Sequence, residues 1–340
     1  MNHFFYDLFL EEPEEPINTI NTINKKKQIH HIVDNTFLIT NEREKTRLLK
    51  QLPNWQQYFY LCNKAEPLRI AEVADDFVPC AMKCNEVLLS YDSRKLIYID
   101  SYLKALRCSR KYIIKIIDFY KSTLVAIQIL NGKGIVHNNI NFNTLLIEEE
   151  NENILLTNFT FSLSLNQAKN DELNLLMPFY TADINKDQDL DIFLPVEFHL
   201  LRYQLDNGLT CLSAYNIETV LRQFVVNHRV LKHFDTRQLL KEGLSYFNKY
   251  VNRNLLETMA SAFETWDNYA LSIVFLRILI GLHKTVKINN KFIILFMKLL
   301  FRNISLDVST RLSLNDTREQ FEILLNKIEL DDFVKLVHSI

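Results

Sequence analysis

The chain has 340 residues, long enough for two modest domains or one large domain with two lobes. Hydrophobic residues make up 48% and charged residues 24%, which excludes a largely disordered or fibrous protein. The formal net charge of −2 gives no global attraction to nucleic acid or to an anionic membrane. The first glycine is Gly132, so the N-terminal third has no glycine-rich phosphate-binding loop.

The cysteines and the apolar segments predict a cytoplasmic protein without metal or cofactor. The five cysteines are scattered and odd in number, as is typical of reduced thiols. Cys80 and Cys84, even with His30 and His31, are not spaced as a compact zinc knuckle. The first ten residues have no lysine or arginine and make a poor signal peptide. The best apolar run, residues 288–301, is interrupted by polar residues, so no membrane span is expected.

The first hundred residues predict mainly strands. Residues 1–30 form an N-terminal extension, which we interpret as a solvated arm or a loose hairpin. Branched and aromatic residues predict strands at 36–40, 58–62 and 95–100. A helix is expected over 42–51, with Asn41 as a possible N-cap.

From residue 110 the pattern becomes helical. Apolar residues recur at helical spacing from Ile113 to Leu130. A short strand, a polar loop and a β-hairpin at 145–157 are expected next. The loop supplies His137, Asn139 and Asn141, and the end of the hairpin supplies Asn158. We expect these polar side chains to converge on a cleft.

This stretch resembles the protein kinase family, which has the catalytic loop H-R-D-L-x-x-x-N and the metal-binding turn D-F-G. His137 is retained, and Asn139 stands in place of the catalytic aspartate. Asn141 stands in place of the loop lysine and Thr144 in place of the metal-binding asparagine. Asn158-Phe159-Thr160 takes the place of D-F-G.

Three later landmarks follow in kinase order. Residues 194–197 resemble the A-P-E segment, residues 266–271 the start of the long buried helix, and residues 310–314 the late arginine. The resemblance implies that Glu197 and Arg311 form a buried pair and that Asp267 braces the catalytic-loop backbone. Alternatively, Glu197 and Arg311 are unrelated surface charges. Asp267 is also a candidate N-cap of a helix that runs to about residue 282, which is compatible with bracing the loop.

The fold class implied by the resemblance is α+β, a two-lobed protein kinase-like fold. A small β-rich N-lobe would span residues 31–100 and a large helical C-lobe residues 101–340. The hinge is expected near residues 100–102. A long insert is expected at about residues 200–262, with helices over 217–226 and 238–250.

The departures from the kinase pattern predict a pseudokinase that is not an enzyme and does not bind Mg-ATP tightly. An asparagine at position 139 cannot act as a base, and Asn158 offers a hard cation only one neutral oxygen. Residues 36–40 contain no lysine, so Glu42 and Glu44 would have no ion-pair partner. Alternatively, the asparagines reflect a general compositional bias of the chain. The chain is a divergent Ser/Thr kinase instead if Asp183, Asp187 or Asp189 reaches the cleft.

The insert suggests what such a protein would do. A kinase-like chain of this kind resembles the kinase-like proteins of large cytoplasmic DNA viruses. We expect a protein-binding scaffold or a virion component. Its partner would contact aromatic and arginine residues of the insert, because these residue types are enriched at protein interfaces. These candidate contacts are Phe224, Arg229, Phe234, Arg237, Tyr246, Phe247 and Tyr250. Alternatively, the aromatic residues only pack the insert onto its own lobe. A third hypothesis, an accessory subunit of a viral nucleic-acid machine, requires a basic face.

Overall fold

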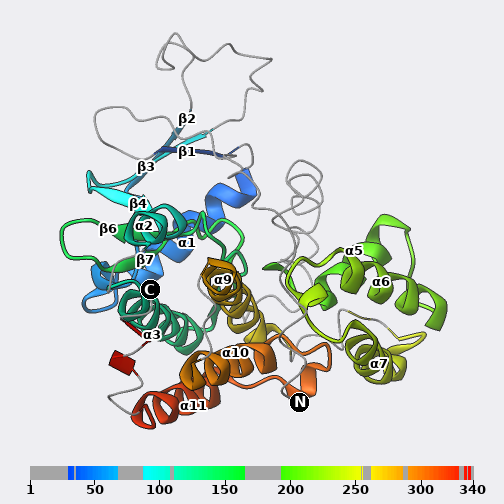
Figure 1. Cartoon of the computed structure of the whole chain (residues 1–340). Coiled ribbons are helices and arrows are strands. Elements are labelled where there is room, and N and C mark those ends of the chain that lie inside the picture. The colour runs from blue at the N-terminus through cyan, green and yellow to red at the C-terminus, as the bar shows by residue number, and fades with distance from the viewer. Residues whose placement is uncertain are drawn as a thin grey trace. The chain divides into compact units, whose positions relative to one another are not determined.

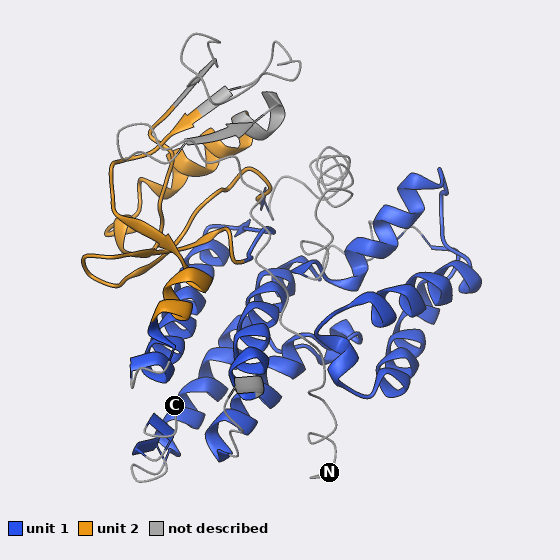
Figure 2. Cartoon of the chain, turned by 45° about the horizontal axis from the view of Figure 1, so that its top comes forward, with its two compact units in different colours: residues 1–16, 106–141, 163–340 blue, residues 17–105, 142–162 orange. Residues whose placement is uncertain are grey.

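The computed structural model describes residues 30–33, 36–67, 87–107, 111–164, 193–253, 255, 262–285, 290–328, 333–334 and 336–337. The chain divides into two compact units (Figure 2). Unit 1 comprises residues 1–16, 106–141 and 163–340, and unit 2 comprises residues 17–105 and 142–162. The predictions for residues 1–29, for Cys80 and Cys84, and for the three aspartates of the 183–189 region lie outside the described residues.

Unit 2 contains two small antiparallel sheets. The first has the order β1-β3-β2, from His30–Val33, Val87–Ser90 and Lys64–Pro67. The second has the order β4-β6-β7, from Leu96–Tyr98, Leu145–Glu148 and Ile154–Leu156. β6 and β7 form the hairpin that the sequence predicts, with Leu146 opposite Leu155. Both leucines are buried in one apolar cluster with Tyr60 and Tyr91, whose rings stack at 4.9 Å.

The helices of unit 2 correct two predictions. α1 spans Thr36–Leu49, so the predicted strand at 36–40 is the first part of a helix. Asn41 therefore lies inside α1 and is not its N-cap; its amide donates to the backbone oxygens of Thr160 and Ser162. Tertiary contacts of this kind override the local strand preference of branched residues. The predicted strand at 58–62 is reduced to a single bridge between Phe59 and Leu156.

A 3₁₀ turn and a short helix complete the described elements that lie mainly in unit 2. A short 3₁₀ turn spans Trp55–Gln57. β4 leads directly into α2, Ile99–Leu106, so the residues expected at a hinge are helical.

Unit 1 is built from long helices (Figure 1). Their bounds are α3 Lys111–Gly132, α5 Val196–Asp206, α6 Ala214–Asn227, α7 Thr236–Phe247, α9 Phe263–Thr285, α10 Lys291–Asn303 and α11 Leu314–Asn326. Short 3₁₀ turns span Leu231–His233, Asn248–Tyr250 and Val308–Thr310. β5, Ile135–Val136, pairs with β8, Leu163–Ser164. The predicted helices near 113–130, 217–226 and 238–250 are confirmed as α3, α6 and α7.

The core of unit 1 surrounds α9, which packs against α3 and α10. The ring of Tyr120 in α3 lies 4.7–5.1 Å from the rings of Phe275, Phe296 and Phe321, which come from α9, α10 and α11. Residues 263–283 of α9 are long and apolar enough to cross a membrane, but 83% of the apolar window is buried inside the protein. Burial on all sides explains why α9 is apolar around its whole circumference.

Two glycines in helices of unit 1 allow a matched test of how closely the helices pack. A β-carbon added at Gly243 in α7 would lie 3.2 Å from Leu221 and 3.3 Å from the β-carbon of Leu306. A β-carbon added at Gly281 in α9 would meet no atom within 4 Å. We expect Gly243→Ala to lower the free energy of unfolding by about 1 kcal/mol, because overpacking outweighs the gain in helix propensity. Gly281→Ala should raise it by about 0.5–1 kcal/mol.

Urea denaturation of the two variants beside the parent protein measures both effects. A Gly243→Ala variant stabilised as much as Gly281→Ala would contradict the close approach of α7 to its neighbours.

Candidate functional site

The polar loop after β5 is held by one carboxylate of α9. In unit 1, Asp267 accepts hydrogen bonds from the backbone N–H groups of His137, at 2.7 Å, and of Asn138, at 2.8 Å. Asn138 has a φ of 59°, the left-handed conformation that asparagine tolerates better than most residues. The two consecutive amides can therefore face the two oxygens of a single side chain.

Asp267 is completely buried, and burial raises its pKa to about 6, although the two backbone hydrogen bonds act in the opposite direction. α9 begins at Phe263, so the interpretation of Asp267 as a helix N-cap is wrong. The carboxylate instead braces the backbone of the polar loop, as the kinase resemblance implies. This explains why a buried acidic residue lies in a largely apolar helix.

The loop side chains bond to one another. His137 is fully buried, and its Nδ1 accepts the backbone N–H of Asn139 at 3.3 Å. The amide of Asn141 donates to the side-chain oxygen of Asn139 at 2.9 Å. The Asn139 oxygen thus has a donor inside the loop. In unit 1, the residues at the catalytic-loop positions supply amide groups and one imidazole.

The corresponding positions in unit 2 are also neutral. Thr144 is buried, and its backbone oxygen accepts the N–H of Thr157 at 3.1 Å, which closes the base of the hairpin. Asn158 has a φ of 64° and accepts the hydroxyl of Thr160 at 2.5 Å. Phe159 is buried with its ring edge toward Phe59. The positions of the kinase metal ligands therefore hold a hydroxyl and an amide.

One buried carboxyl group lies beside this turn in unit 2. Glu42 of α1 is completely buried, and neither of its oxygens has a hydrogen-bond partner of good geometry among the described residues. Burial raises the pKa of Glu42 to about 7, although the backbone N–H of Phe159 and the hydroxyl of Thr46 lie close enough to lower it. Glu42 is one of the two glutamates, with Glu44, that the kinase resemblance identifies as candidates for the helix glutamate of kinases.

Within the described residues, no three histidine, cysteine, aspartate or glutamate side chains gather to hold a metal ion. His137, Asn139 and Asn141 belong to unit 1, and Thr144 and Asn158 belong to unit 2. None of the five has a carboxylate, and amides and hydroxyls bind ligands by hydrogen bonds rather than by accepting a proton.

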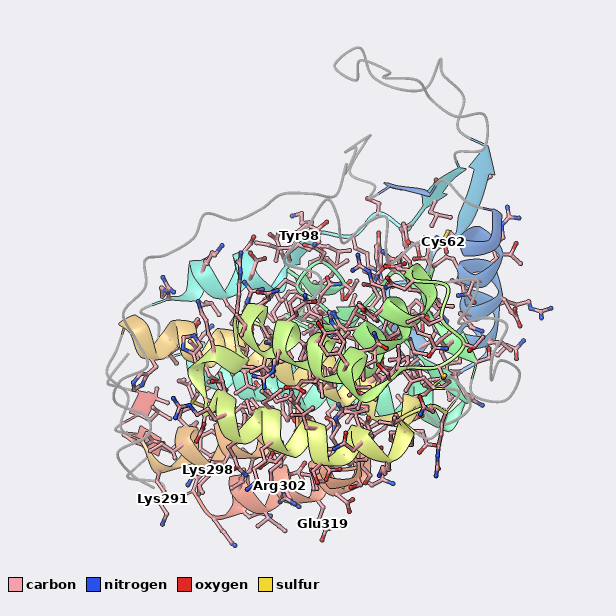
Figure 3. The ribbon with its side chains drawn as sticks, turned by 90° about the vertical axis from the view of Figure 1, so that its right-hand side faces the viewer. Cys62, Tyr98, Lys291, Lys298, Arg302 and Glu319 are labelled. Carbon is pink, nitrogen blue, oxygen red and sulfur yellow. The ribbon has the colours of Figure 1, made fainter. Side chains whose placement is uncertain are left out.

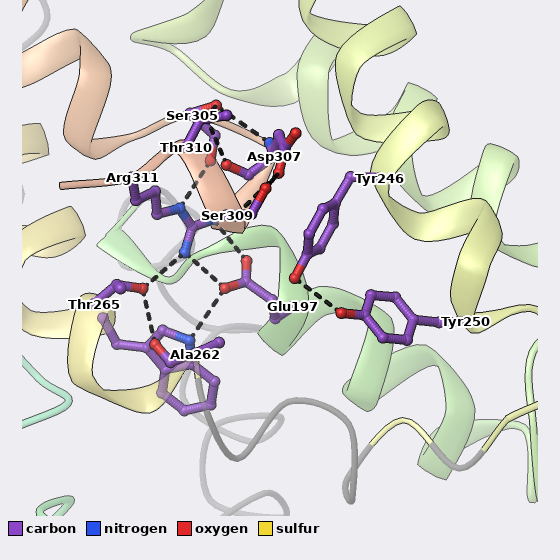
Figure 4. Close-up of polar contacts among 11 residues, drawn as sticks. Glu197, Tyr246, Tyr250, Ala262, Thr265, Ser305, Asp307, Ser309, Thr310 and Arg311 are labelled. Atoms are coloured by element: carbon purple, nitrogen blue, oxygen red, sulfur yellow. Dashed lines mark hydrogen bonds and ion pairs between the residues drawn. The ribbon is translucent and has the colours of Figure 1, made fainter. Parts of the chain in front are cut away.

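A second polar centre of unit 1 ties together segments far apart in the sequence (Figure 4). Arg311 and Glu197 form a two-pronged ion pair, with Nη1 to Oε1 at 2.6 Å and Nη2 to Oε2 at 2.8 Å. Both side chains are inaccessible to solvent. The indole N–H of Trp266 donates to Glu197, while Arg311 also donates to the backbone of Ser305 and the hydroxyl of Thr265. This is the buried pair that the resemblance implies, not two unrelated surface charges.

The predicted partner contacts differ widely in exposure. Phe224 and Phe247 are buried, Arg237 is exposed, and Arg229, Phe234, Tyr246 and Tyr250 are intermediate. Phe234 stacks on Phe301 of α10 at 4.1 Å. The hydroxyls of Tyr246 and Tyr250 lie 3.0 Å apart, and the Lys249 ammonium lies 3.7 Å from the Tyr246 ring centre. Several of these aromatic groups therefore pack within unit 1.

The sequence interpretation missed two exposed apolar residues on α6. Tyr215 is 76% exposed and Val226 is 73% exposed, whereas other large exposed hydrophobic residues in the described ranges do not exceed 44%. Eleven residues make just over three helical turns, so Tyr215 and Val226 lie on the same face of α6. The signal in the sequence is that both are out of phase with the buried positions, such as Ile217 and Leu221.

The basic side chains of α10 form a short stripe. Lys291, Lys298 and Arg302 are exposed and lie within one face of the helix, with Glu319 of α11 labelled below them in Figure 3. Arg302 donates to Gln320 at 2.9 Å. Three cations beside an acidic residue are typical of a solvated helix face rather than of the basic face that the nucleic-acid hypothesis requires.

Comparison with known proteins gives a likeness of fold only. No known family model matches the chain, and no curated protein matches it in sequence. Three crystal structures of the PknI kinase domain of Mycobacterium tuberculosis, all mutants, are similar to it with a TM-score of 0.42 and 8–10% identity. The matches cover 88% of this chain and 84–85% of the kinase domain chains.

This comparison corrects the prediction that the chain is not an enzyme. The solved structures to which the chain is similar are kinase domains.

Proposed function

We propose that this chain is a kinase-like protein that binds a protein partner, and that the partner contacts the exposed face of α6. The observation that carries the proposal is the pair of exposed apolar side chains, Tyr215 and Val226, on that face. Single exposed apolar residues are common on protein surfaces, and here two strongly exposed ones share one face of the same helix. The Glu218–Arg222 ion pair, at 2.5 Å, lies between them on the same helix.

The composition of this face suits protein recognition. Tyrosine and arginine are enriched among the residues that contribute most to binding, and a charged pair beside apolar contacts adds specificity. The opposite side of α6, with Ile217, Leu221 and Val225, is buried in unit 1. α6 is therefore anchored by its inner face and can present Tyr215 and Val226 without being part of the core.

The kinase-like part of the proposal is supported by contacts inside unit 1. Asp267 holds two loop amides, and Glu197 pairs with Arg311, as the family resemblance implies. A role as a virion or assembly component in the cytoplasm stays a prediction.

Photocrosslinking tests the binding proposal in the cells that express the protein. A benzophenone amino acid at position 215 should give one discrete adduct, and the additional change Val226→Asp should remove it. The same photoreactive residue at Glu319, an exposed position on α11, is the control. Equal adducts at positions 215 and 319, or an adduct unaffected by Val226→Asp, would contradict binding through α6.

Phosphoryl transfer by a divergent site is the second candidate function. The buried Glu42 beside the backbone of Phe159 favours it, because a carboxyl group is thereby placed next to the turn that contains Asn158. This function predicts a nucleotide-dependent thermal shift in Mg²⁺ or Mn²⁺ and radiolabel transfer that Asn139→Ala or Asn158→Ala abolishes. Absence of both signals would leave protein binding as the function of the chain.

A further inference from the structure

The outer side of α6 carries one continuous row of side chains. Tyr215, Thr219, Arg222 and Val226 follow one another at intervals of four, three and four residues. This is the spacing with which one helix packs along another. Tyr215, Arg222 and Val226 are exposed and Thr219 is partly exposed, so no described segment of the chain covers the row.

The charges beside this row can exchange partners. Glu218 and Arg222 pair within α6 at 2.5 Å. Their side chains are 43% and 59% exposed, and an ion pair of this kind contributes little to stability because water solvates both groups. An opposite charge on another molecule can therefore replace either partner. From Tyr215 to Val226, this face of the helix is apolar, acidic, basic and again apolar.

This order is self-complementary when two copies of α6 run antiparallel. With the twofold axis at the middle of the row, Tyr215 of each copy lies opposite Val226 of the other, and Thr219 lies opposite Arg222. Arg222 of the second copy is then offset from Glu218 by only one residue, about 1.5 Å along the helix axis. A parallel second copy would instead place Glu218 against Glu218 and Arg222 against Arg222, and like charges across a contact oppose binding.

We propose that the partner bound by α6 is a second copy of this chain, in an antiparallel contact with twofold symmetry. The inference rests on the proposed function, because it uses the same face of α6. The apolar ends of the two rows cover each other, and the alternating charges at the centre fix the direction and the register. A helix of 14 residues is about 21 Å long, so the contact is smaller than that of a permanent dimer, and association is weak and reversible.

A reciprocal exchange of charge tests this contact on the full chain. Glu218→Arg places only arginines at the centre of the dimer, and Arg222→Glu places only glutamates there. We expect either variant alone to raise the Kd of self-association by about tenfold or more, because two attractive pairs become repulsive. An equimolar mixture should associate again, since the arginines of one chain then face the glutamates of the other. Sedimentation velocity at several concentrations measures the three samples.

Asp100 and Lys104, an exposed pair with the same four-residue spacing on α2, supply the matched control. Asp100→Lys and Lys104→Asp should leave the Kd of self-association unchanged. Thermal denaturation of each variant confirms that it is folded. Self-association that is unaffected by the charge changes in α6, or that the mixture does not restore, would overturn the assignment of the contact to α6.

Engineered cysteines test the direction of the contact. Every variant also carries Cys211→Ser, which removes a partly exposed thiol near this face. A chain with Tyr215→Cys should form a disulfide with a chain that has Val226→Cys, and neither chain should form one with itself. The two positions are about 16 Å apart along α6, too far for identical cysteines to meet in the antiparallel pair. Disulfides between identical cysteines would overturn the antiparallel register.

The mass of the photocrosslinked adduct separates this inference from the proposed function. An adduct at position 215 with twice the mass of the chain supports both. An adduct with a different protein, formed by a chain that stays monomeric at all concentrations, would overturn self-association and leave protein binding through α6 intact. A monomeric chain that gives no adduct would overturn both.

Discussion

Replacement of Arg311 by alanine is expected to lower the free energy of unfolding by about 3–5 kcal/mol, because the carboxylate of Glu197 would be left buried without its partner. The pair is inaccessible to solvent and joined by two short hydrogen bonds, so water cannot compensate the lost charge. The segment before α11 would also lose the donor to the backbone oxygen of Ser305. Urea denaturation followed by far-ultraviolet circular dichroism measures the change.

Two further variants identify the cause of this loss. Lys327→Ala removes an exposed cation and should change stability by less than about 0.5 kcal/mol. The double change Glu197→Met with Arg311→Met removes both charges and should recover part of the stability, because no isolated buried charge remains. Similar small effects of Arg311→Ala and Lys327→Ala would mean that the pair does not stabilise unit 1. A double variant less stable than Arg311→Ala would mean that shape, rather than charge, matters there.

The Glu197–Arg311 pair also illustrates what a sequence can reveal. The two residues are 114 positions apart, and periodicity cannot connect them. Their pairing follows only from the ordered series of kinase-like landmarks. By contrast, α3, α6 and α7 follow from helical spacing alone, because each has one continuous buried face.

The first residues of α1 mark where local patterns fail. Residues 36–40 are rich in branched and aromatic types, which favour a strand, yet they are the start of a helix. The deciding contacts, such as that of Asn41 with the backbone of Thr160, involve residues more than a hundred positions away. The sequence does not reveal an open pocket that lies beside α5 and α6, for a related reason. Arg202 and Arg229 line the same pocket only after the two helices have packed.

Glu42 gives a pH dependence of stability whose sign follows from its burial. A glutamate in the unfolded chain titrates near 4.5, whereas in the folded protein its pKa is about 7. Between these values the folded protein retains a proton that the unfolded chain has lost. The free energy of unfolding therefore falls as the pH rises from about 4.5 to 7, and the full loss persists at higher pH. With 1.36 kcal/mol for each unit of pKa, this loss amounts to about 3 kcal/mol.

Glu42→Gln isolates this contribution, because glutamine has nearly the same shape and cannot ionise. We expect the variant to match the parent protein near pH 4.5 and to exceed it by about 3 kcal/mol near pH 8. Burial also raises the pKa of Asp267, to about 6, so the parent protein titrates at a second buried acid over an overlapping range. The quantity to compare is consequently the difference between the two proteins at each pH, in which the Asp267 contribution cancels.

Hydrogen exchange of the α1 amides measures the effect within unit 2. Burial raises the pKa of the neighbouring Cys62 thiol, and the negative charge of Glu42 raises it further. At pH 8 the charged glutamate lies among buried groups without a hydrogen-bond partner of good geometry in the described part of the chain, which favours local opening of α1. Glu42→Gln should therefore slow exchange there, after correction for the intrinsic rate, more than it does at pH 5. Equal protection of the two proteins at both pH values would show that Glu42 is solvated or paired when it ionises.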